Sequence, residues 1–147
     1  MAERQFTPLE VNRMIPELER IMKYLRSLEG EIQEKEWKLK QAKVEASREG
    51  NFVDESTFLK EEAEIDFQRI LVQGQFERVR ELGGEIKGGY LVDFPSRIDG
   101  HRVLLCWKPG EQAVAWYHGP YEGMMGRKPI PGKFLKAEQS DGTTEDA

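Results

Sequence analysis

The apolar positions in the first third of the chain repeat with heptad spacing. Six of them fall seven residues apart, namely Val11, Leu18, Leu25, Ile32, Leu39 and Ala46. A repeat that averages 3.5 residues keeps one apolar stripe of a helix facing a partner helix over many turns. The pattern therefore predicts one long helix, with a coiled-coil-like seam against a second helix.

Local signals mark the ends of this helix and one interior position. Thr7 is a favourable N-cap, Pro8 suits the first helical position, and Glu10 completes a capping box. Gly50 supplies a stop after about residue 48. Pro16 removes one backbone hydrogen bond and crowds the preceding turn, so we expect a kink or a short break near Arg13.

The apolar residues of the next helical segment, from about residue 54 to Leu82, form two faces. One face holds Leu59, Ala63, Phe67 and Ile70, and the other holds Phe58, Ile65, Val72, Phe76 and Val79. A helix with one neighbour needs only one stripe, so this helix is predicted to have two neighbours. The short connection makes the two helices an antiparallel hairpin. We assign contacts with a partner to Trp37, Phe58, Ile65, Val72 and Phe76.

The composition changes after Gly83 toward glycine and aromatic residues. Three segments read as strands: Tyr90–Phe94, Arg102–Lys108 and Ala113–His118. Asp99-Gly100 and Pro109-Gly110 mark the turns between them. A three-stranded antiparallel meander buries little core by itself, so it should lean on the helices.

These elements define an α+β protein with three segments. Residues 1–82 form the helical hairpin, residues 83–136 form a small β module packed on the helices, and residues 137–147 form a disordered acidic tail. The 147 residues are enough for one compact domain, or for a helical arm with a small appended module.

Charge and composition exclude several classes of function. The chain carries a net charge of −5, and its basic residues form no concentrated patch, which argues against nucleic-acid binding. Neither a signal peptide nor a membrane-spanning stretch is apparent, so we expect a soluble cytoplasmic protein. The single cysteine, Cys106, excludes a disulfide within the chain and a multi-cysteine metal site.

Five polar residues of the β module are candidates for a ligand site, either for an anion or for a small substrate: Asp93, Arg97, Asp99, His118 and Arg127. Arginine presents a planar fork that suits carboxylate or phosphate, and histidine titrates near neutral pH. Four of them also have a structural interpretation: Asp93, Arg97 and Asp99 as turn formers or clamps, and His118 as a strand end bonded to backbone. Cys106 is expected to be buried and inert.

No spacing typical of metal ligands occurs, and no nucleophile–base pair can be assigned. Asp93, His101 and Glu122 are conceivable companions of His118, but a metal or catalytic role needs several groups that converge. We therefore expect no cofactor and no metal, and an enzyme is the less favoured interpretation.

A set of short motifs is similar to one known family. The motifs are Phe6-Thr-Pro-Leu-Glu-Val-Asn12, Ile15-Pro16, Gly89-Tyr-Leu-Val-Asp-Phe-Pro95, Asp99-Gly100, Leu105-Cys-Trp107, Trp116-Tyr-His118 and Gly126-Arg127. Together they resemble a bacterial family of small proteins catalogued as a domain of unknown function, the one numbered 2203. The resemblance covers roughly residues 6–130, with Val11 standing where alanine is expected. It implies a helical hairpin plus β module in a bacterial cytoplasmic protein, and it brings no activity or catalytic residue.

The sequence thus leads to two hypotheses of function. The first is a non-enzymatic interaction or scaffold protein that self-associates, most simply as a twofold dimer, because so much of the chain is devoted to helix packing. The alternative is a small-ligand (anion) binder or small enzyme with a pocket between sheet and helices.

Overall fold

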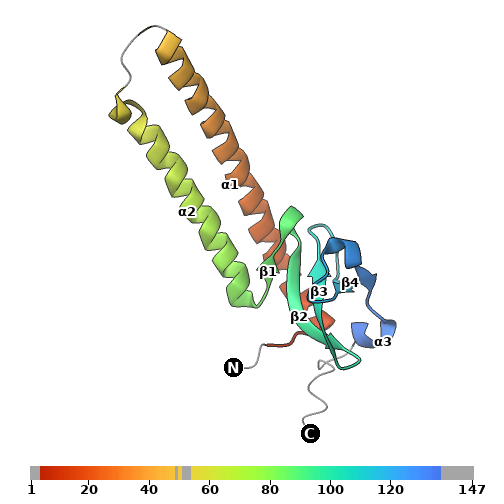
Figure 1. Cartoon of the computed structure of the whole chain (residues 1–147). Coiled ribbons are helices and arrows are strands. Elements are labelled where there is room, and N and C mark those ends of the chain that lie inside the picture. Colours follow the sequence, from red (N-terminus) through yellow and green to blue (C-terminus); the bar gives the residue numbers. More distant parts are fainter. Residues whose placement is uncertain (1–3, 49, 51–53, 137–147) are drawn as a thin grey trace. The chain divides into compact units, whose positions relative to one another are not determined.

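The computed structural model describes residues 4–48, 50 and 54–136, and it confirms the α+β class (Figure 1). The chain groups into two compact units, both of which contain parts of the long helices. The hairpin unit is Lys23–Gln75, and the described part of the sheet unit combines residues 4–22 with residues 76–136. The predicted boundary at residue 83 followed the change in composition, whereas the two units are defined by contacts between residues and divide both long helices. The predicted tail, residues 137–147, lies outside the described residues.

The first helix, α1 (Pro8–Arg48), begins where the capping residues predict. The Thr7 amide donates to Glu10 Oε1 at 2.9 Å, and the Glu10 amide donates to Thr7 Oγ1 at 3.2 Å. This reciprocal pair satisfies two amides that the first turn leaves without helical partners. The helix continues across Pro16, so the expected short break is absent from the described helix. One missing hydrogen bond is a small loss beside the packing of Val11, Ile15 and Leu18.

In the hairpin unit, α1 and α2 (Leu59–Leu82) run antiparallel (Figure 1). The short 3₁₀ helix η1 (Glu55–Phe58) precedes α2, and Asp54 caps it through the Ser56 amide. The heptad residues Leu25 and Ile32 are buried together with Leu28 and Ile65. Polar pairs flank this seam: Gln68 donates to Glu31 at 2.7 Å, and Arg69 and Lys43 form ion pairs with Glu36 and Glu62. Exposed ion pairs contribute only ~0–1 kcal/mol each, so the apolar seam dominates.

Within the described residues the sheet has five strands, not the three predicted. They are β1 (Glu85–Ile86), β2 (Val92–Ile98), β3 (His101–Trp107), β4 (Trp116–His118) and β5 (Lys128–Pro129). They pair in sequence order, and every neighbour is antiparallel. β1 and β5 were not predicted because each has only two residues. β2 also continues through Pro95 to Ile98, a stretch that the sequence analysis assigned to a loop.

One face of the sheet makes the core of its unit. Val92, Phe94, Ser96, Val103, Leu105 and Trp107 alternate onto this face and are buried. The chain before α1 is fastened to it: the Phe6 amide donates to the Pro95 carbonyl at 2.8 Å, and Ser96 Oγ donates to the Phe6 carbonyl at 2.5 Å. The rings of Phe6 and Phe94 meet edge to face, with their centroids 5.3 Å apart.

A glycine lets α2 turn into the sheet at this core. Gly83 follows α2 with a φ of 102°, in the region that favours glycine. A β-carbon at this position would lie 2.1 Å from Cζ of Phe6. The Phe6 ring therefore occupies the space that any side chain at position 83 would need.

Three shorter helical pieces complete the described chain, namely η2 (Gly88–Tyr90), η3 (Met124–Gly126) and α3 (Gly132–Leu135). Among the described helices, none combines the length and apolarity needed to cross a membrane.

Candidate functional site

The second face of the sheet carries a buried polar cluster. Asp93 on β2 pairs with Cys106 on β3, and the next strand brings His118 opposite Leu104, two residues from Cys106. Because cross-strand partners and alternate residues share a face, all three side chains point to the same side. Their exposed fractions are 4% for Asp93, 0% for Cys106 and 4% for His118. The sheet thus brings three potential ligand groups together away from water.

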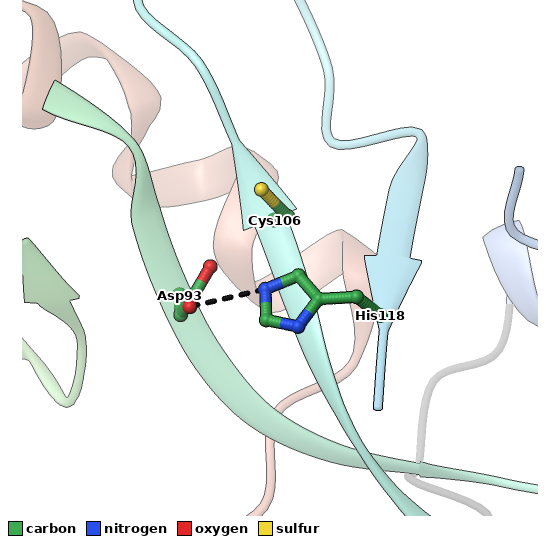
Figure 2. A group of neighbouring side chains, drawn as sticks. All are labelled: Asp93, Cys106 and His118. Atoms are coloured by element: carbon green, nitrogen blue, oxygen red, sulfur yellow. Dashed lines mark hydrogen bonds and ion pairs between the residues drawn. The ribbon is translucent and has the colours of Figure 1, made fainter. Parts of the chain in front are cut away.

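The three side chains converge closely (Figure 2). One ligand atom from each, a carboxylate oxygen, the sulfur and an imidazole nitrogen, lies within 4.8 Å of the other two. His118 Nε2 lies 3.1 Å from Asp93 Oδ2. His118 Nδ1 lies 2.8 Å from the Gly119 carbonyl oxygen. Since a carbonyl only accepts, Nδ1 carries a hydrogen, and Nε2 faces the cluster.

One atom of this cluster has no hydrogen-bond partner. Asp93 Oδ1 is buried, and none of the described residues donates to it. A buried carboxylate oxygen without a donor is costly, and native structures contain few such atoms. This oxygen therefore requires an explanation beyond the Asp93–His118 pair.

The geometry does not support a cysteine nucleophile. Burial, together with the nearby Asp93 carboxylate, raises the pKa of Cys106 from 9.0 to about 11, although Arg127 opposes this. The thiol therefore stays protonated at neutral pH, whereas a nucleophile must be a thiolate. The imidazole uses Nδ1 for the Gly119 carbonyl and turns Nε2 to Asp93, so the Cys–His–Asp relay of a catalytic triad is not formed.

Two cavities reach the cluster from the same side of the sheet. A cavity of about 380 Å³ is lined by Asp93 and His118 together with Lys87, Glu122 and Met124. A second cavity, of about 480 Å³, is lined by Asp93 and by Arg4, Arg102 and Tyr121. Glu122 is fixed at the mouth because the Gly119 amide and Lys128 both donate to it, and these contacts lower its pKa.

The remaining predicted ligand residues do not join Asp93 and His118. Arg97 donates to the Gly100 carbonyl at 3.3 Å, and the exposed Asp99 accepts from Lys133 at 3.5 Å. Both lie at the turn between β2 and β3, as the structural interpretation of these residues proposed. Neither lines either of the cavities that contain Asp93.

Arg127 supports the back of the cluster and is not directed at a ligand. Its guanidinium donates to the Cys106 carbonyl at 3.1 Å and to Glu111 at 2.7 Å, and it lies over the Trp116 ring. Burial alone would lower the pKa of Arg127, but the bonds to Glu111 and Cys106 outweigh it and raise that pKa. The guanidinium is thus held in place as a cation.

The residues predicted to contact a partner are mostly turned inward. Ile65 is only 3% exposed, and Phe58, Val72 and Phe76 are partly buried; of the five, Trp37 alone is largely exposed. Ile65 is thus buried within the chain, and the assignment of partner contacts to these residues stays a prediction. Two apolar stripes of similar strength cannot reveal from sequence which of them packs against α1.

The other face of α2 is left exposed. Leu59, Phe67 and Ile70 are 61%, 60% and 66% exposed, and the exposed Ala63 lies between them. A neighbouring groove of about 580 Å³ contains Tyr24, Leu28, Phe67 and Leu71. Large apolar side chains exposed side by side are typical of an interaction surface.

The comparisons with known proteins give one family. A family model described as an uncharacterized conserved protein, DUF2203, matches residues 4–130. The chain belongs to the DUF2203 family. No curated protein and no solved structure matches this DUF2203 protein. The family was expected from the short motifs, and it assigns no role to the cluster or to the exposed face of α2.

Cys106 is the site residue that sequence reasoning missed, although its pairing with Asp93 could have been predicted from the turn between their strands. A two-residue turn at Asp99-Gly100 fixes the register of β2 and β3, and that register places Asp93 opposite Cys106. The position of His118 depends on the longer connection between β3 and β4, residues 108–115, whose length sets no register.

Proposed function

We propose that this DUF2203 protein is a non-enzymatic interaction protein that self-associates through the exposed face of α2. The observation that carries the proposal is the exposure of Leu59, Phe67 and Ile70 on one side of a regular helix. Removing apolar area from water contributes about 25 cal/mol per Å². A second copy is the occupant that we infer, and a twofold dimer is the simplest arrangement.

The spacing of small and large residues supports a second copy as the partner. The α2 row consists of Leu59, Ala63, Phe67, Ile70 and Gly74, which share one side of the helix at spacings of three and four residues. In an antiparallel pair with its twofold axis beside Phe67, Leu59 lies opposite Gly74 and Ala63 lies opposite Ile70. A β-carbon at Gly74 would meet no atom within 4 Å, so the row has room for the partner's leucine.

Several finer expectations belong to the same proposal. The burial of Leu25 and Ile32 supports coiled-coil-like packing of α1 against α2 within the hairpin unit. Trp37 is exposed on the same unit and is a second candidate for contact with a partner. A bacterial cytoplasmic location agrees with the family resemblance and with the single free thiol, Cys106.

Light scattering coupled to size-exclusion chromatography tests the dimer. The wild-type chain should elute with about twice its mass of 17.0 kDa at micromolar concentration. A charge at the centre of the row, Phe67→Glu, should weaken the dimer by about 30-fold or more, because a central anchor is typically worth at least ~2 kcal/mol. Gln33→Glu adds the same charge to an exposed position of α1 and is the matched control.

Two results would overturn this proposal. One is a monomeric mass at every concentration up to several hundred micromolar. The other is a dimer that Phe67→Glu leaves as strong as the Gln33→Glu control, which would place the interface elsewhere.

A second candidate function is binding of a small anion next to Asp93 and His118. It is favoured by the convergence of these two residues on one cavity, which also contains Lys87. Inorganic phosphate is a suitable probe, with the imidazole resonances of His118 as the readout and those of the exposed His101 as the internal control. Resonances of His118 that do not move at millimolar phosphate would contradict anion binding at this cavity.

A further inference from the structure

We propose that Asp93, Cys106 and His118 form a binding site for a divalent transition-metal ion of the zinc class. The proposal concerns the sheet unit alone, so it goes beyond self-association and does not depend on it. It rests on the types of donor, on their distances, on the hydrogen bond behind the histidine and on the unpartnered carboxylate oxygen.

The donor set selects the class of metal. A thiol sulfur, an imidazole nitrogen and a carboxylate oxygen together suit zinc and its borderline neighbours such as cobalt(II). Calcium and magnesium prefer oxygen ligands alone, and therefore a site built around Cys106 disfavours them. The chain has one cysteine and two histidines, so this set uses the only sulfur ligand that the protein could offer apart from methionine.

The distances are close to those that a metal needs. Bonds of about 2.0–2.3 Å in a tetrahedron place neighbouring ligand atoms ~3.3–3.8 Å apart. The three ligand atoms already lie within 4.8 Å of one another, and Nε2 lies 3.1 Å from Oδ2. Rotations of the side chains are enough to bring them onto one ion, because adjacent antiparallel strands hold their backbones in register.

The hydrogen bond behind His118 orients the ring as metal sites require. Histidine ligands almost always donate their second ring N–H to a carbonyl or carboxylate, which fixes the tautomer. Here Nδ1 donates to the Gly119 carbonyl at 2.8 Å, and Nε2 faces Asp93 Oδ2 at 3.1 Å within the same cluster as Cys106.

The unpartnered oxygen is the independent observation that points to a ligand. Asp93 is 4% exposed, and its Oδ1 receives no hydrogen bond from the described residues. The Asp93–His118 pair accounts for Oδ2 and leaves Oδ1 unexplained. A metal ion at the cluster would supply a positive charge next to Oδ1, the oxygen that has no hydrogen-bond donor among the described residues.

The cavity of about 380 Å³ supplies the fourth position. It is lined by Asp93 and His118, so an ion held by the three residues would retain one side open to water. Three protein ligands plus one water is the coordination of zinc sites that remain accessible to small molecules.

Binding must release protons. The Cys106 S–H bond breaks, the sulfur lone pair forms the S–metal bond, and the proton leaves to solvent. The hydrogen held between His118 Nε2 and Asp93 Oδ2 must leave as well, so that the nitrogen lone pair and the carboxylate oxygen can bind the ion. The charged and titratable groups that face this thiol are Asp93 from β2, His118 from β4 and Arg127 from the segment after η3. Because the metal and these protons compete for the same atoms, the metal affinity should rise with pH.

A cobalt(II) titration of the full chain tests the proposal. Because Cys106 is the only cysteine, a thiolate-to-cobalt charge-transfer band can arise from this residue alone. We expect that band together with the intense visible bands of tetrahedral cobalt(II), at one ion per chain, and displacement of cobalt by zinc. Loaded protein should also melt at a higher temperature than the same protein in a chelator, since the ion binds the folded state.

Matched variants separate the cluster from adventitious binding. Asp93→Asn and His118→Gln should each lower the cobalt affinity by at least ~10–100-fold, which is the effect of losing even an outer-shell partner. Asp99→Asn and His101→Gln change the same residue types at exposed positions and should leave the affinity unaltered. Circular dichroism of each variant without metal identifies any variant that fails to fold.

The wild-type protein decides the question even if the cluster variants unfold. A folded wild-type chain that gives no charge-transfer band at a tenfold excess of cobalt near pH 8 would overturn the proposal. The same conclusion would follow if cobalt bound without a sulfur band, or if the two control variants lost as much affinity as the cluster variants.

Discussion

The hairpin unit and the sheet unit depart from ordinary burial in opposite directions. In the hairpin unit, Phe67 and Ile70 are largely exposed to solvent although both side chains are apolar. In the sheet unit, Asp93 and His118 are removed from solvent although both are polar. An exposed apolar side chain does not contribute the free energy that its burial would give, and a buried polar side chain loses the free energy of its hydration. Each departure needs a compensating partner, which we infer to be a second copy for the first and a metal ion for the second.

The largest expected effect lies at the buried pair. His118→Leu leaves the Asp93 carboxylate buried without the nitrogen that faces it, and loss of one member of such a pair costs ~3–5 kcal/mol. The double variant Asp93→Leu/His118→Leu should recover a large part of that loss. Urea unfolding of the metal-free protein measures both, with Lys133→Ala, at an exposed pair, as the control. If His118→Leu lowers the free energy of unfolding by less than ~1 kcal/mol, the buried pair contributes no more than an exposed ion pair does.

Two isoleucines on α2 sharpen the contrast between the faces of one helix. Ile65→Ala should lower the free energy of unfolding by ~2–5 kcal/mol because it empties part of the seam. Ile70→Ala should change it by less than ~0.5 kcal/mol at concentrations low enough to keep the chain monomeric. Chemical denaturation of the two variants under identical conditions is the measurement. Equal losses would mean that α2 buries both faces within one chain.

The Cys106 thiol gives a pH signature to the sheet unit. Its pKa is raised from 9.0 to about 11, so the folded chain holds the proton more tightly than the unfolded chain. Stability from this group is complete below pH 9 and declines as the pH rises toward 11, by up to ~2–3 kcal/mol at 1.36 kcal/mol per unit. The difference in unfolding free energy between wild type and Cys106→Ala, followed from pH 7 to 11, isolates the contribution. A difference that stays constant over this range would contradict the shift.

The smallest effect concerns the start of α1. Thr7→Ala removes the side-chain oxygen that accepts from the Glu10 amide and should cost ~0.5–2 kcal/mol. Thr7→Ser keeps that oxygen and should recover most of the loss. Thermal unfolding compares them, and equal melting temperatures for the alanine and serine variants would show that the cap contributes nothing.

The sequence predicted the features that local chemistry decides. The capping box at Thr7 and Glu10 is confirmed, as is the turn at Asp99-Gly100, where Asp99 and Gly100 both adopt positive φ. The α+β class follows from the change between helical periodicity and short β segments. The structure ties Arg97 to the Gly100 carbonyl, which agrees with the structural interpretation of this residue.

The features that the sequence could not predict depend on the pairing register of the strands and on a choice between two equally apolar faces of α2. The two-residue strands β1 and β5 carry no periodicity of their own, and they form because β2 and β4 offer edges to pair with. The choice between the two stripes of α2 depends on which one fits α1. The meeting of Cys106 and His118 depends on a connection whose length fixes no pairing, so a cysteine interpreted as inert became part of the cluster.

The glycine that follows α2 has a consequence for how this chain can vary or be redesigned. Gly83 directly follows α2, and in addition to its positive φ the Phe6 ring fills the space that a β-carbon would need. A saturation library should therefore return glycine alone at position 83 and a wide spectrum at Gly30, where no atom lies within 4 Å of a β-carbon and φ is not positive. Positions 6 and 83 are distant in the chain, but their substitutions would then be coupled. A residue smaller than phenylalanine would be needed at position 6 before any side chain could fit at position 83.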